Sequence, residues 1–382
     1  MERHIEFSTT EEEREQRRQE RVRRRKARQR QKRRALLLRA VPAACLLLGL
    51  ALFLLSQNGG QAREDPAAPA DQPAVQTAAP AEEPEAPPEP PEEPVDRRAA
   101  VTADTALIAD DLTSDEMNSR CAVVIDLETN TVLAQKDMDT VISPASMTKL
   151  LTLLTAAEAI EDHGSLTDTV TIDFEITDYC YRHDCSVAGF LKDETVTVEQ
   201  LLYAAILPSG ADGALGLAKY VAGDQDAFVA LMNEKAEALG IADTAKFANC
   251  IGLYDENNVC TLRDMAVILA AVMENDLCRR IVTTKIYEIP ASDAHPEGMV
   301  LSNWFLRKIE DHVPEGVEVI GGKTGFVDES GSCAASCAQG PDGRLYLCVT
   351  ADTFSSWRCI KDHVSLYTTY IPCLLYTSDA AD

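Results

Sequence analysis

The most constraining feature of the sequence is a helical segment that is apolar almost all the way round. Residues 147–160 are Met, Leu, Ala and Ile, apart from three Thr, one Lys and one Glu. A helix of this kind has to be buried in the middle of a domain. Ser143 is a good N-cap and Pro144 suits the first helical position, so we expect the helix to begin there. It should run to about Glu161 and end before Gly164.

The first turn of this helix carries a serine and a lysine three residues apart. Ser146 and Lys149 therefore share one face of the helix. A serine hydroxyl is a poor nucleophile until a base takes its proton, and a lysine held in a dry site is neutral often enough to do so. The alternative is that Ser-x-x-Lys occurs by chance and that Lys149 only reaches for water. The motif alone does not decide between the two.

Two later stretches carry residues that complete a known set. Residues 207–212 read Leu-Pro-Ser-Gly-Ala-Asp between two apolar helical segments, and residues 320–326 read Ile-Gly-Gly-Lys-Thr-Gly-Phe after a β-branched run. An S-x-x-K motif followed by S-D-N-type and K-T-G motifs is the signature of class A β-lactamases and penicillin-binding proteins. The chain order Ser146, Ser209, Lys323 fits that set.

More specifically, the chain resembles the low-molecular-weight penicillin-binding proteins that are D-alanyl-D-alanine carboxypeptidases, the S11 serine peptidases. Further matching stretches are the strand pair 122–126 and 132–134, and Phe-Ala-Asn at 247–249 leading to Gly-Leu at 252–253. The resemblance covers about residues 115–370. It implies a β-lactamase/DD-peptidase-like α/β (α+β) fold, in which an antiparallel sheet is flanked by helices and stands beside a helical lobe.

The resemblance also implies a catalytic role for three residues. Ser146 would attack the carbonyl of the penultimate D-alanine of a peptidoglycan stem peptide, and Lys149 would take its proton. Ser209 would relay a proton to the leaving amine; the alternative for Ser209 is a helix N-cap. Water would then hydrolyse the acyl-enzyme. No cofactor and no metal is implied, and β-lactam antibiotics would be covalent inhibitors.

Five residues besides Ser146 are implied to bind the substrate. Lys323 and Thr324 would hold its terminal carboxylate by charge and hydrogen bond. Gly325 would let the substrate backbone lie against the strand. The backbone N–H groups of Ser146 and Phe326 would form the oxyanion hole. Gly210 belongs to the same substrate-binding set.

The sequence departs from the family pattern at Ala211. The family usually has Asn there, whose side chain hydrogen-bonds both the catalytic lysine and the substrate amide. Alanine can do neither, and Asp212 should point elsewhere on a helix. Losing one hydrogen bond to a charged group costs roughly 1.5–3 kcal/mol, which would slow the enzyme without silencing it.

The order of predicted elements agrees with a sheet packed beside a helical lobe. A hairpin is expected within 121–135, turning at 128–130, and a short strand within 165–173. Helices are expected at 194–205, 211–220, 225–239 and 261–275. Strands are expected at 317–320, 332–337 and 345–351, with a closing helix at 361–370. Strands at both ends of the chain with helices between them favour this architecture.

The first hundred residues predict a membrane-anchored protein. Residues 1–34 form a basic tail, and residues 35–55 form an apolar segment long enough to span a bilayer. The positive-inside rule then places the N-terminus in the cytoplasm. Residues 56–100 are rich in Pro, Ala and Glu and read as an extended linker to a catalytic domain at 101–372. We interpret residues 35–55 as an uncleaved, single-pass signal-anchor that is followed by an extracytoplasmic domain. The alternative is a cleaved signal peptide.

The last ten residues differ in origin from the rest of the chain, and the charge is distributed unevenly along it. Residues 373–382 resemble a translated sequencing adapter, so we expect the native C-terminus, with any further domain, to be missing. Beyond residue 39 the chain has 21 basic and 55 acidic residues, a net charge of −34. That excludes a general nucleic-acid binder outside the tail.

Ten of the twelve cysteines lie between the apolar segment and the last ten residues. Cys180 and Cys185 are the most plausible disulfide pair, since disulfides are allowed outside the cytoplasm. A metal site with His183 would match no standard zinc spacing. Cys333, Cys337 and Cys348 alternate with small apolar residues and should be buried in strands. The sequence therefore predicts one disulfide in a loop and three buried thiols in strands.

Three other functions compete with a carboxypeptidase. A β-lactamase needs a carboxylate for deacylation, usually in a Glu-x-x-Leu-Asn loop, and the sequence has no such loop. A slow or non-catalytic penicillin- or peptidoglycan-binding homologue is favoured only by Ala211. A purely structural membrane protein does not explain three ordered motifs.

Overall fold

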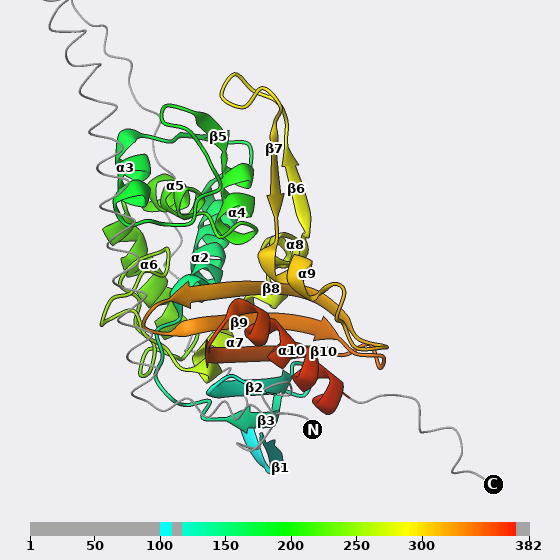
Figure 1. Ribbon diagram of the computed structural model, residues 1–382. Coiled ribbons are helices and arrows are strands. Elements are labelled where there is room, and N and C mark those ends of the chain that lie inside the picture. The colour runs from blue at the N-terminus through cyan, green and yellow to red at the C-terminus, as the bar shows by residue number, and fades with distance from the viewer. Residues whose placement is uncertain (1–99, 109–116, 372–382) are drawn as a thin grey trace, which may run out of the picture. The chain divides into compact units, whose positions relative to one another are not determined.

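The computed structural model describes residues 100–108 and 117–371 (Figure 1). The predicted basic tail, the predicted membrane segment, residues 373–382 and all of the predicted linker except its last residue lie outside the described residues. Within the described ranges, none of the helices has the length and apolar character needed to cross a bilayer.

The core of the domain is a six-stranded sheet. Its strand order is β1-β3-β2-β10-β9-β8. The strands are β1 (Ala100–Leu107), β2 (Cys121–Asp126), β3 (Thr131–Lys136), β8 (Glu318–Val327), β9 (Gly331–Gln339) and β10 (Leu345–Thr353). The predicted hairpin is confirmed, because β2 and β3 pair antiparallel. The expectation of a wholly antiparallel sheet is wrong in one place, since β1 runs parallel to β3 at the edge.

Helices cover both faces of this sheet. On one side lies a lobe of α2 (Thr148–His163), α3 (Phe174–Arg182), α4 (Val198–Ile206), α5 (Ala211–Ala222), α6 (Gln225–Ala238), α7 (Leu262–Glu274) and α8 (Asp276–Thr283). On the other side lie α9 (Trp304–Ile309) and α10 (Ser356–Tyr370) (Figure 1). Successive side chains of β2 point to opposite faces of the sheet. Val123 packs in the core with α2, and Val124 packs with Leu366 and Tyr367 of α10.

The central helix is buried as its sequence predicts, but it begins differently. Its Leu residues are at most 1% exposed. The segment opens with a 3-10 turn, η1 (Ala145–Met147), and Ser143 Oγ has no hydrogen-bond partner, so the predicted Ser143 N-cap is wrong. The reason is the backbone of Ala145, which has a φ of +48°. This left-handed conformation is incompatible with a regular first helical turn beginning at Pro144. α2 ends at His163, directly before Gly164.

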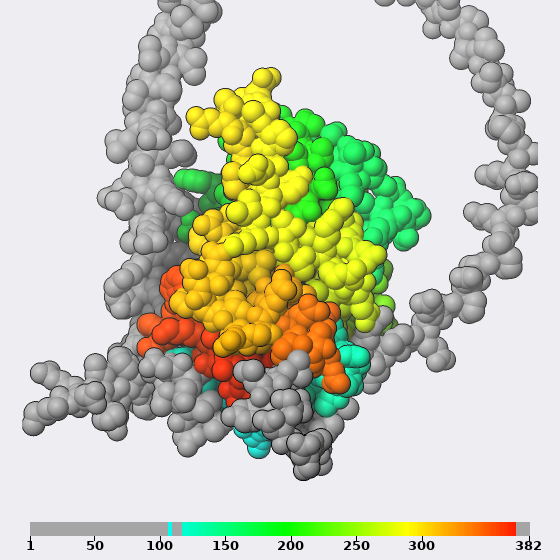
Figure 2. All heavy atoms as spheres, turned by 90° about the vertical axis from the view of Figure 1, so that its right-hand side faces the viewer, coloured from blue at the N-terminus to red at the C-terminus, as the bar shows by residue number. Residues whose placement is uncertain are grey.

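Several short elements were not expected from the sequence. Among them are helices α3, α8 and α9 and the hairpin of β6 (Ile286–Ile289) and β7 (Met299–Ser302). This hairpin stands beside the helical lobe, away from the sheet (Figure 1; Figure 2). A second small antiparallel pair consists of β4 (Thr169–Thr171) and β5 (Thr195–Thr197). Because β5 occupies the residues at which a helix was expected to begin, helix α4 begins at Val198 and not at 194. Thr197 and Gln200 form a capping box at its start.

All ten cysteines that the structure describes are thiols and not disulfides. Cys180 and Cys185 are therefore not bonded in the structure. Cys333, Cys337 and Cys348 are at most 1% exposed, which confirms that they are buried in strands. In the described ranges, no three His, Cys, Asp or Glu side chains come together as a metal site would require.

Candidate active site

The predicted nucleophile and base lie together at the start of the central helix. Lys149 Nζ is 3.2 Å from Ser146 Oγ and 2.6 Å from the carbonyl oxygen of Ile251. Lys149 is only 2% exposed. Burial lowers the pKa of its ammonium group to about 8. The lysine therefore has a neutral fraction near neutral pH, which is the form that the predicted base role requires.

A tight turn at 249–253 supports this pair. The side-chain oxygen of Asn249 accepts the backbone N–H groups of Ile251, Gly252 and Leu253 at 3.3, 2.7 and 2.9 Å, and its Nδ2 donates to the Leu253 carbonyl at 3.0 Å. This network aims the Ile251 carbonyl at Lys149. The sequence points to the Phe-Ala-Asn stretch only through the family resemblance and does not point to Ile251, because a backbone acceptor leaves no residue-type signal.

The same turn touches the nucleophile turn. Gly252 has a φ of +77°, and a Cβ on it would lie 1.9 Å from the carbonyl oxygen of Ala145. No side chain fits in that space. Gly252 therefore allows the 249–253 turn to pack against the residue directly before Ser146.

The second and third motifs meet where the helical lobe contacts strand β8. Lys323 Nζ donates to Ser209 Oγ at 2.8 Å and to the Thr324 carbonyl at 2.8 Å. Burial, and then the nearby charge of Lys149, lowers the pKa of Lys323. The helix-capping alternative for Ser209 is wrong, because the N-cap of α5 is Gly210 and no side chain caps it. The structure thus brings Ser209 and Lys323 together over 114 residues of sequence.

Asp212 points away from this contact, as predicted. Its carboxylate accepts the backbone N–H groups of Ala188, Gly189 and Phe190 at 2.8, 2.9 and 3.2 Å. Ala211 is 1% exposed and its backbone N–H donates to the carbonyl oxygen of Ser186. The Asp212 carboxylate and the Ala211 backbone N–H are thus bonded to a neighbouring loop.

Gly325 brings strand β8 against the nucleophile turn. A Cβ on Gly325 would lie 2.7 Å from Cys333 Sγ, 3.0 Å from the Pro144 carbonyl oxygen and 3.0 Å from the Ser146 nitrogen. The expected reason for this glycine, room for substrate, is therefore wrong: the space is filled by the protein itself. The close approach is that of Gly325 itself, and the next residue, Phe326, is half exposed.

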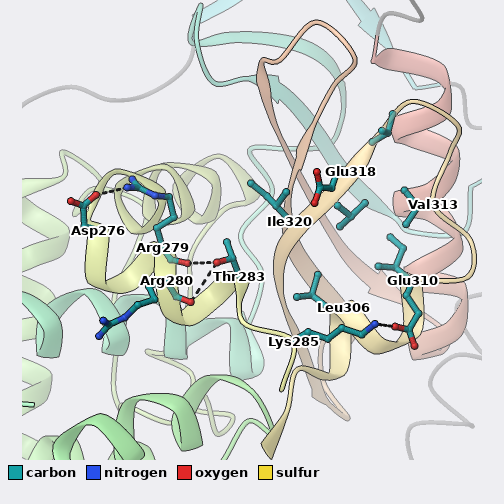
Figure 3. A pocket seen from close by; sticks show the side chains of 13 residues that line it. Asp276, Arg279, Arg280, Thr283, Lys285, Leu306, Glu310, Val313, Glu318 and Ile320 are labelled. Carbon is teal, nitrogen blue, oxygen red and sulfur yellow. Dashed lines mark hydrogen bonds and ion pairs between the residues drawn. The ribbon is translucent and has the colours of Figure 1, made fainter. Parts of the chain in front are cut away.

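A groove of about 880 Å³ lies elsewhere (Figure 3). It runs between α8, α9 and the start of β8, and an ion pair between Lys285 and Glu310 crosses its lower end. Polar and apolar side chains line it in a mixed pattern, and none of the predicted site residues is among them. The groove is thus separate from the candidate active site.

The chain was compared with known proteins. A family model described as D-alanyl-D-alanine carboxypeptidase, peptidase S11, matches residues 108–353. A D-alanyl-D-alanine carboxypeptidase of Bacillus subtilis is 30% identical over 229 residues, which cover 58% of this chain and 54% of that protein. A D-alanyl-D-alanine carboxypeptidase of Streptomyces is 36% identical over 165 residues, 42% of this chain and 56% of that protein. The chain thus spans about half the length of the curated relatives it matches.

Solved structures show the same similarity. A D-alanyl-D-alanine carboxypeptidase of Mycobacterium tuberculosis aligns with a TM-score of 0.58 and 26% identity over 70% of this chain and 94% of the other. A Streptomyces DD-transpeptidase aligns with a TM-score of 0.60 and 27% identity over 67% of this chain and 97% of the other. The mixed α/β fold with its sheet and helices is thus that of the DD-peptidases. The family match covers well over half of the chain, and the chain belongs to the D-alanyl-D-alanine carboxypeptidase family, peptidase S11.

Proposed function

We propose that this protein is a serine-type D-Ala-D-Ala carboxypeptidase that removes the terminal D-alanine from peptidoglycan stem peptides. The observation that carries the proposal is the buried Ser146–Lys149 pair, with Lys149 Nζ 3.2 Å from Ser146 Oγ. The lowered pKa of Lys149 suits a general base. The Ser209–Lys323 contact adds a second proton-carrying pair.

The reaction follows from these contacts. Ser146 Oγ attacks the carbonyl carbon of the penultimate D-alanine while its proton passes to Lys149 Nζ. The C–N bond then breaks as Ser209 gives its proton to the leaving amine and receives in turn the proton held by Lys149, so that Lys149 is neutral again; Lys323 holds Ser209 Oγ by a hydrogen bond. A water molecule attacks the resulting ester with Lys149 again as base, which releases the shortened peptide and regenerates Ser146.

Binding groups for the substrate lie along strand β8. Lys323 and Thr324 are proposed to hold the terminal carboxylate, whose negative charge favours the ammonium form of the buried lysine. The backbone N–H groups of Ser146 and Phe326 are proposed to stabilise the developing oxyanion. A β-lactam presents the same carbonyl and carboxylate and would acylate Ser146 covalently.

The experiment is D-alanine release from diacetyl-Lys-D-Ala-D-Ala by the full chain. Ser146→Ala should abolish release. Ser143→Ala is the matched control, because this neighbouring hydroxyl makes no hydrogen bond and release should persist. A folded wild-type chain that releases no D-alanine would refute the carboxypeptidase.

One observation favours a second candidate, a slow or binding-only homologue. Ala211 offers no side-chain hydrogen bond to Lys149 or to substrate. Such a homologue would be labelled on Ser146 by a fluorescent penicillin and would release D-alanine slowly or not at all. Labelling and release measured on the same sample therefore separate the two candidates.

The location of the enzyme is also a proposal. We infer a single-pass protein of the cell membrane, anchored by residues 35–55, with the catalytic domain outside the cytoplasm. The basic residues before this 21-residue segment and the Pro-rich stretch after it support that orientation. Protease added to intact spheroplasts should remove the catalytic domain; a domain that is cut only after lysis would contradict the orientation.

A further inference from the structure

Helix α3 ends in a well-defined reversal of the chain. Asp184 has a φ of +52°, in the left-handed region. Its backbone N–H donates to the Tyr181 carbonyl at 3.3 Å, and the next N–H, of Cys185, donates to the Cys180 carbonyl at 3.0 Å. This pair of nested hydrogen bonds around a left-handed residue is a Schellman motif.

The motif brings two particular side chains together. The residue after the left-handed position packs against the residue five places earlier, usually as a hydrophobic contact. Here these positions are Cys185 and Cys180, and their side chains are in hydrogen-bond contact. Cys180 is 4% exposed and Cys185 is partly exposed. A helix ending of ordinary geometry thus holds two thiols in contact, with one of them accessible from solvent.

We propose that Cys180 and Cys185 are a disulfide-forming site, oxidised by exchange with a second disulfide such as that of a thiol oxidoreductase or of glutathione. The Cys185 thiolate attacks the oxidant, forms a mixed disulfide and releases one thiol. The Cys180 sulfur, after losing its proton, attacks Cys185 Sγ and releases the second thiol. Two electrons and two protons pass to the oxidant, which is reduced to two thiols.

This bond would fasten the loop that frames one side of the active site. The residue after Cys185, Ser186, accepts the Ala211 N–H with its carbonyl, and the amides of 188–190 bind the Asp212 carboxylate. These contacts hold the first turn of α5, directly after Ser209. Because the thiols already touch in the native geometry, oxidation should leave the active site unchanged and stabilise the loop against local opening.

The test uses the full chain and its own trypsin sites. Arg182 lies between the two cysteines, so trypsin separates them into peptides 150–182 and 183–192, each with one cysteine. After incubation with glutathione disulfide and alkylation of remaining thiols, the two peptides should appear linked by mass spectrometry. After dithiothreitol they should appear separately and alkylated. Cys185→Ser should remove the linked species.

Two results would overturn the proposal. One is that both peptides stay unlinked at oxidant concentrations that oxidise a dithiol standard. The other is that the linked partner is peptide 247–263, which carries Cys250 and Cys260. Because the mass readout is made on the wild-type chain, a variant that fails to fold does not affect it.

Formation of this disulfide does not depend on the proposed function. D-alanine release by the reduced chain tests the function without any disulfide. Oxidation should change penicillin acylation of Ser146 by less than about twofold while raising the melting temperature.

Discussion

Lys149 and Lys323 are two lysines buried in one site, and their protonation governs the proposed chemistry. Each is 2% exposed, and the charge of one lowers the pKa of the other. Two ammonium groups in so dry a site are unfavourable together, so the site favours one neutral lysine. The neutral form of Lys149 is the one that can take the Ser146 proton.

Acylation should therefore rise with pH. With Lys149 at a pKa of about 8, its neutral fraction grows about tenfold between pH 7 and pH 9, and the rate constant for acylation by a fluorescent penicillin should grow with it. Lys149→Arg is the control, because arginine stays protonated and should not support the reaction. A rate that is flat over this range would contradict a base role for Lys149.

A substitution at Ala211 should increase the rate of acylation. An ammonium group has three N–H donors, and Ser146 and Ile251 account for two of those of Lys149. Ala211→Asn should supply a third acceptor and raise the acylation rate about tenfold, which corresponds to about 1.4 kcal/mol. Ala211→Val adds bulk without an acceptor and should give no gain. Equal effects of both variants would show that the residue acts by packing alone.

At the scale of elements, the site depends on two backbone segments that press against the nucleophile turn. Strand β8 approaches it through Gly325, and the 249–253 turn approaches it through Gly252. Neither segment contributes a side chain at the contact. The position of Ser146 is thus fixed by backbone packing, with α2 behind it.

Gly252→Ala should therefore damage both stability and activity. Its Cβ would meet the Ala145 carbonyl at 1.9 Å and would also strain a left-handed residue. We expect a loss of about 3 kcal/mol or more in the free energy of unfolding, with acylation reduced at least tenfold. Chemical denaturation and penicillin labelling measure the two effects.

Gly223→Ala provides the matched control. Gly223 has a φ of +86°, but a Cβ there has nothing within 4 Å. Its substitution should cost only the backbone strain, about 1 kcal/mol, and leave acylation intact. Similar losses in both variants would show that left-handed strain, and not the clash with Ala145, dominates.

At the scale of the whole molecule, buried polar contacts join helix α10 to the segment before β2 and to strands β9 and β10. Asp362 accepts the backbone N–H groups of Asn118 and Ser119 at 2.8 and 2.7 Å, before β2. The next residue, His363, has its Nδ1 2.7 Å from Ser336 Oγ and its Nε2 3.0 Å from Thr350 Oγ1. Burial lowers the pKa of His363 to about 3.

This histidine should make the fold sensitive to acid. Its folded pKa lies below its ordinary value of 6.5, so stability is full above pH 6.5 and is lost as pH falls toward 3. The contribution is at most about 1.4 kcal/mol per pH unit in that window. His363→Gln should flatten the slope of unfolding free energy against pH by that amount. Because Asp362 is present in both proteins, the difference between them isolates His363; identical slopes would contradict the assignment.

Much of the fold could be predicted because its signals are local. The β2–β3 hairpin follows from alternating residues around a turn at which Asn130 is left-handed. The bounds of α5 and α7 agree with the sequence to within two residues, because their apolar periodicity is strong. The six residues of α9 and the β6–β7 hairpin carry too few periods to be recognised.

The sequence by itself determined the order of the motifs, the buried helix that carries Ser146 and Lys149, and the family resemblance, since each is written in neighbouring residues. Only the tertiary structure decided which groups touch. The Ser209–Lys323 contact, the Ile251 carbonyl on Lys149 and the glycine approaches to Ala145 and Ser146 join segments about a hundred or more residues apart. Such contacts depend on how elements pack, and backbone acceptors and missing side chains leave no pattern in a sequence to predict them.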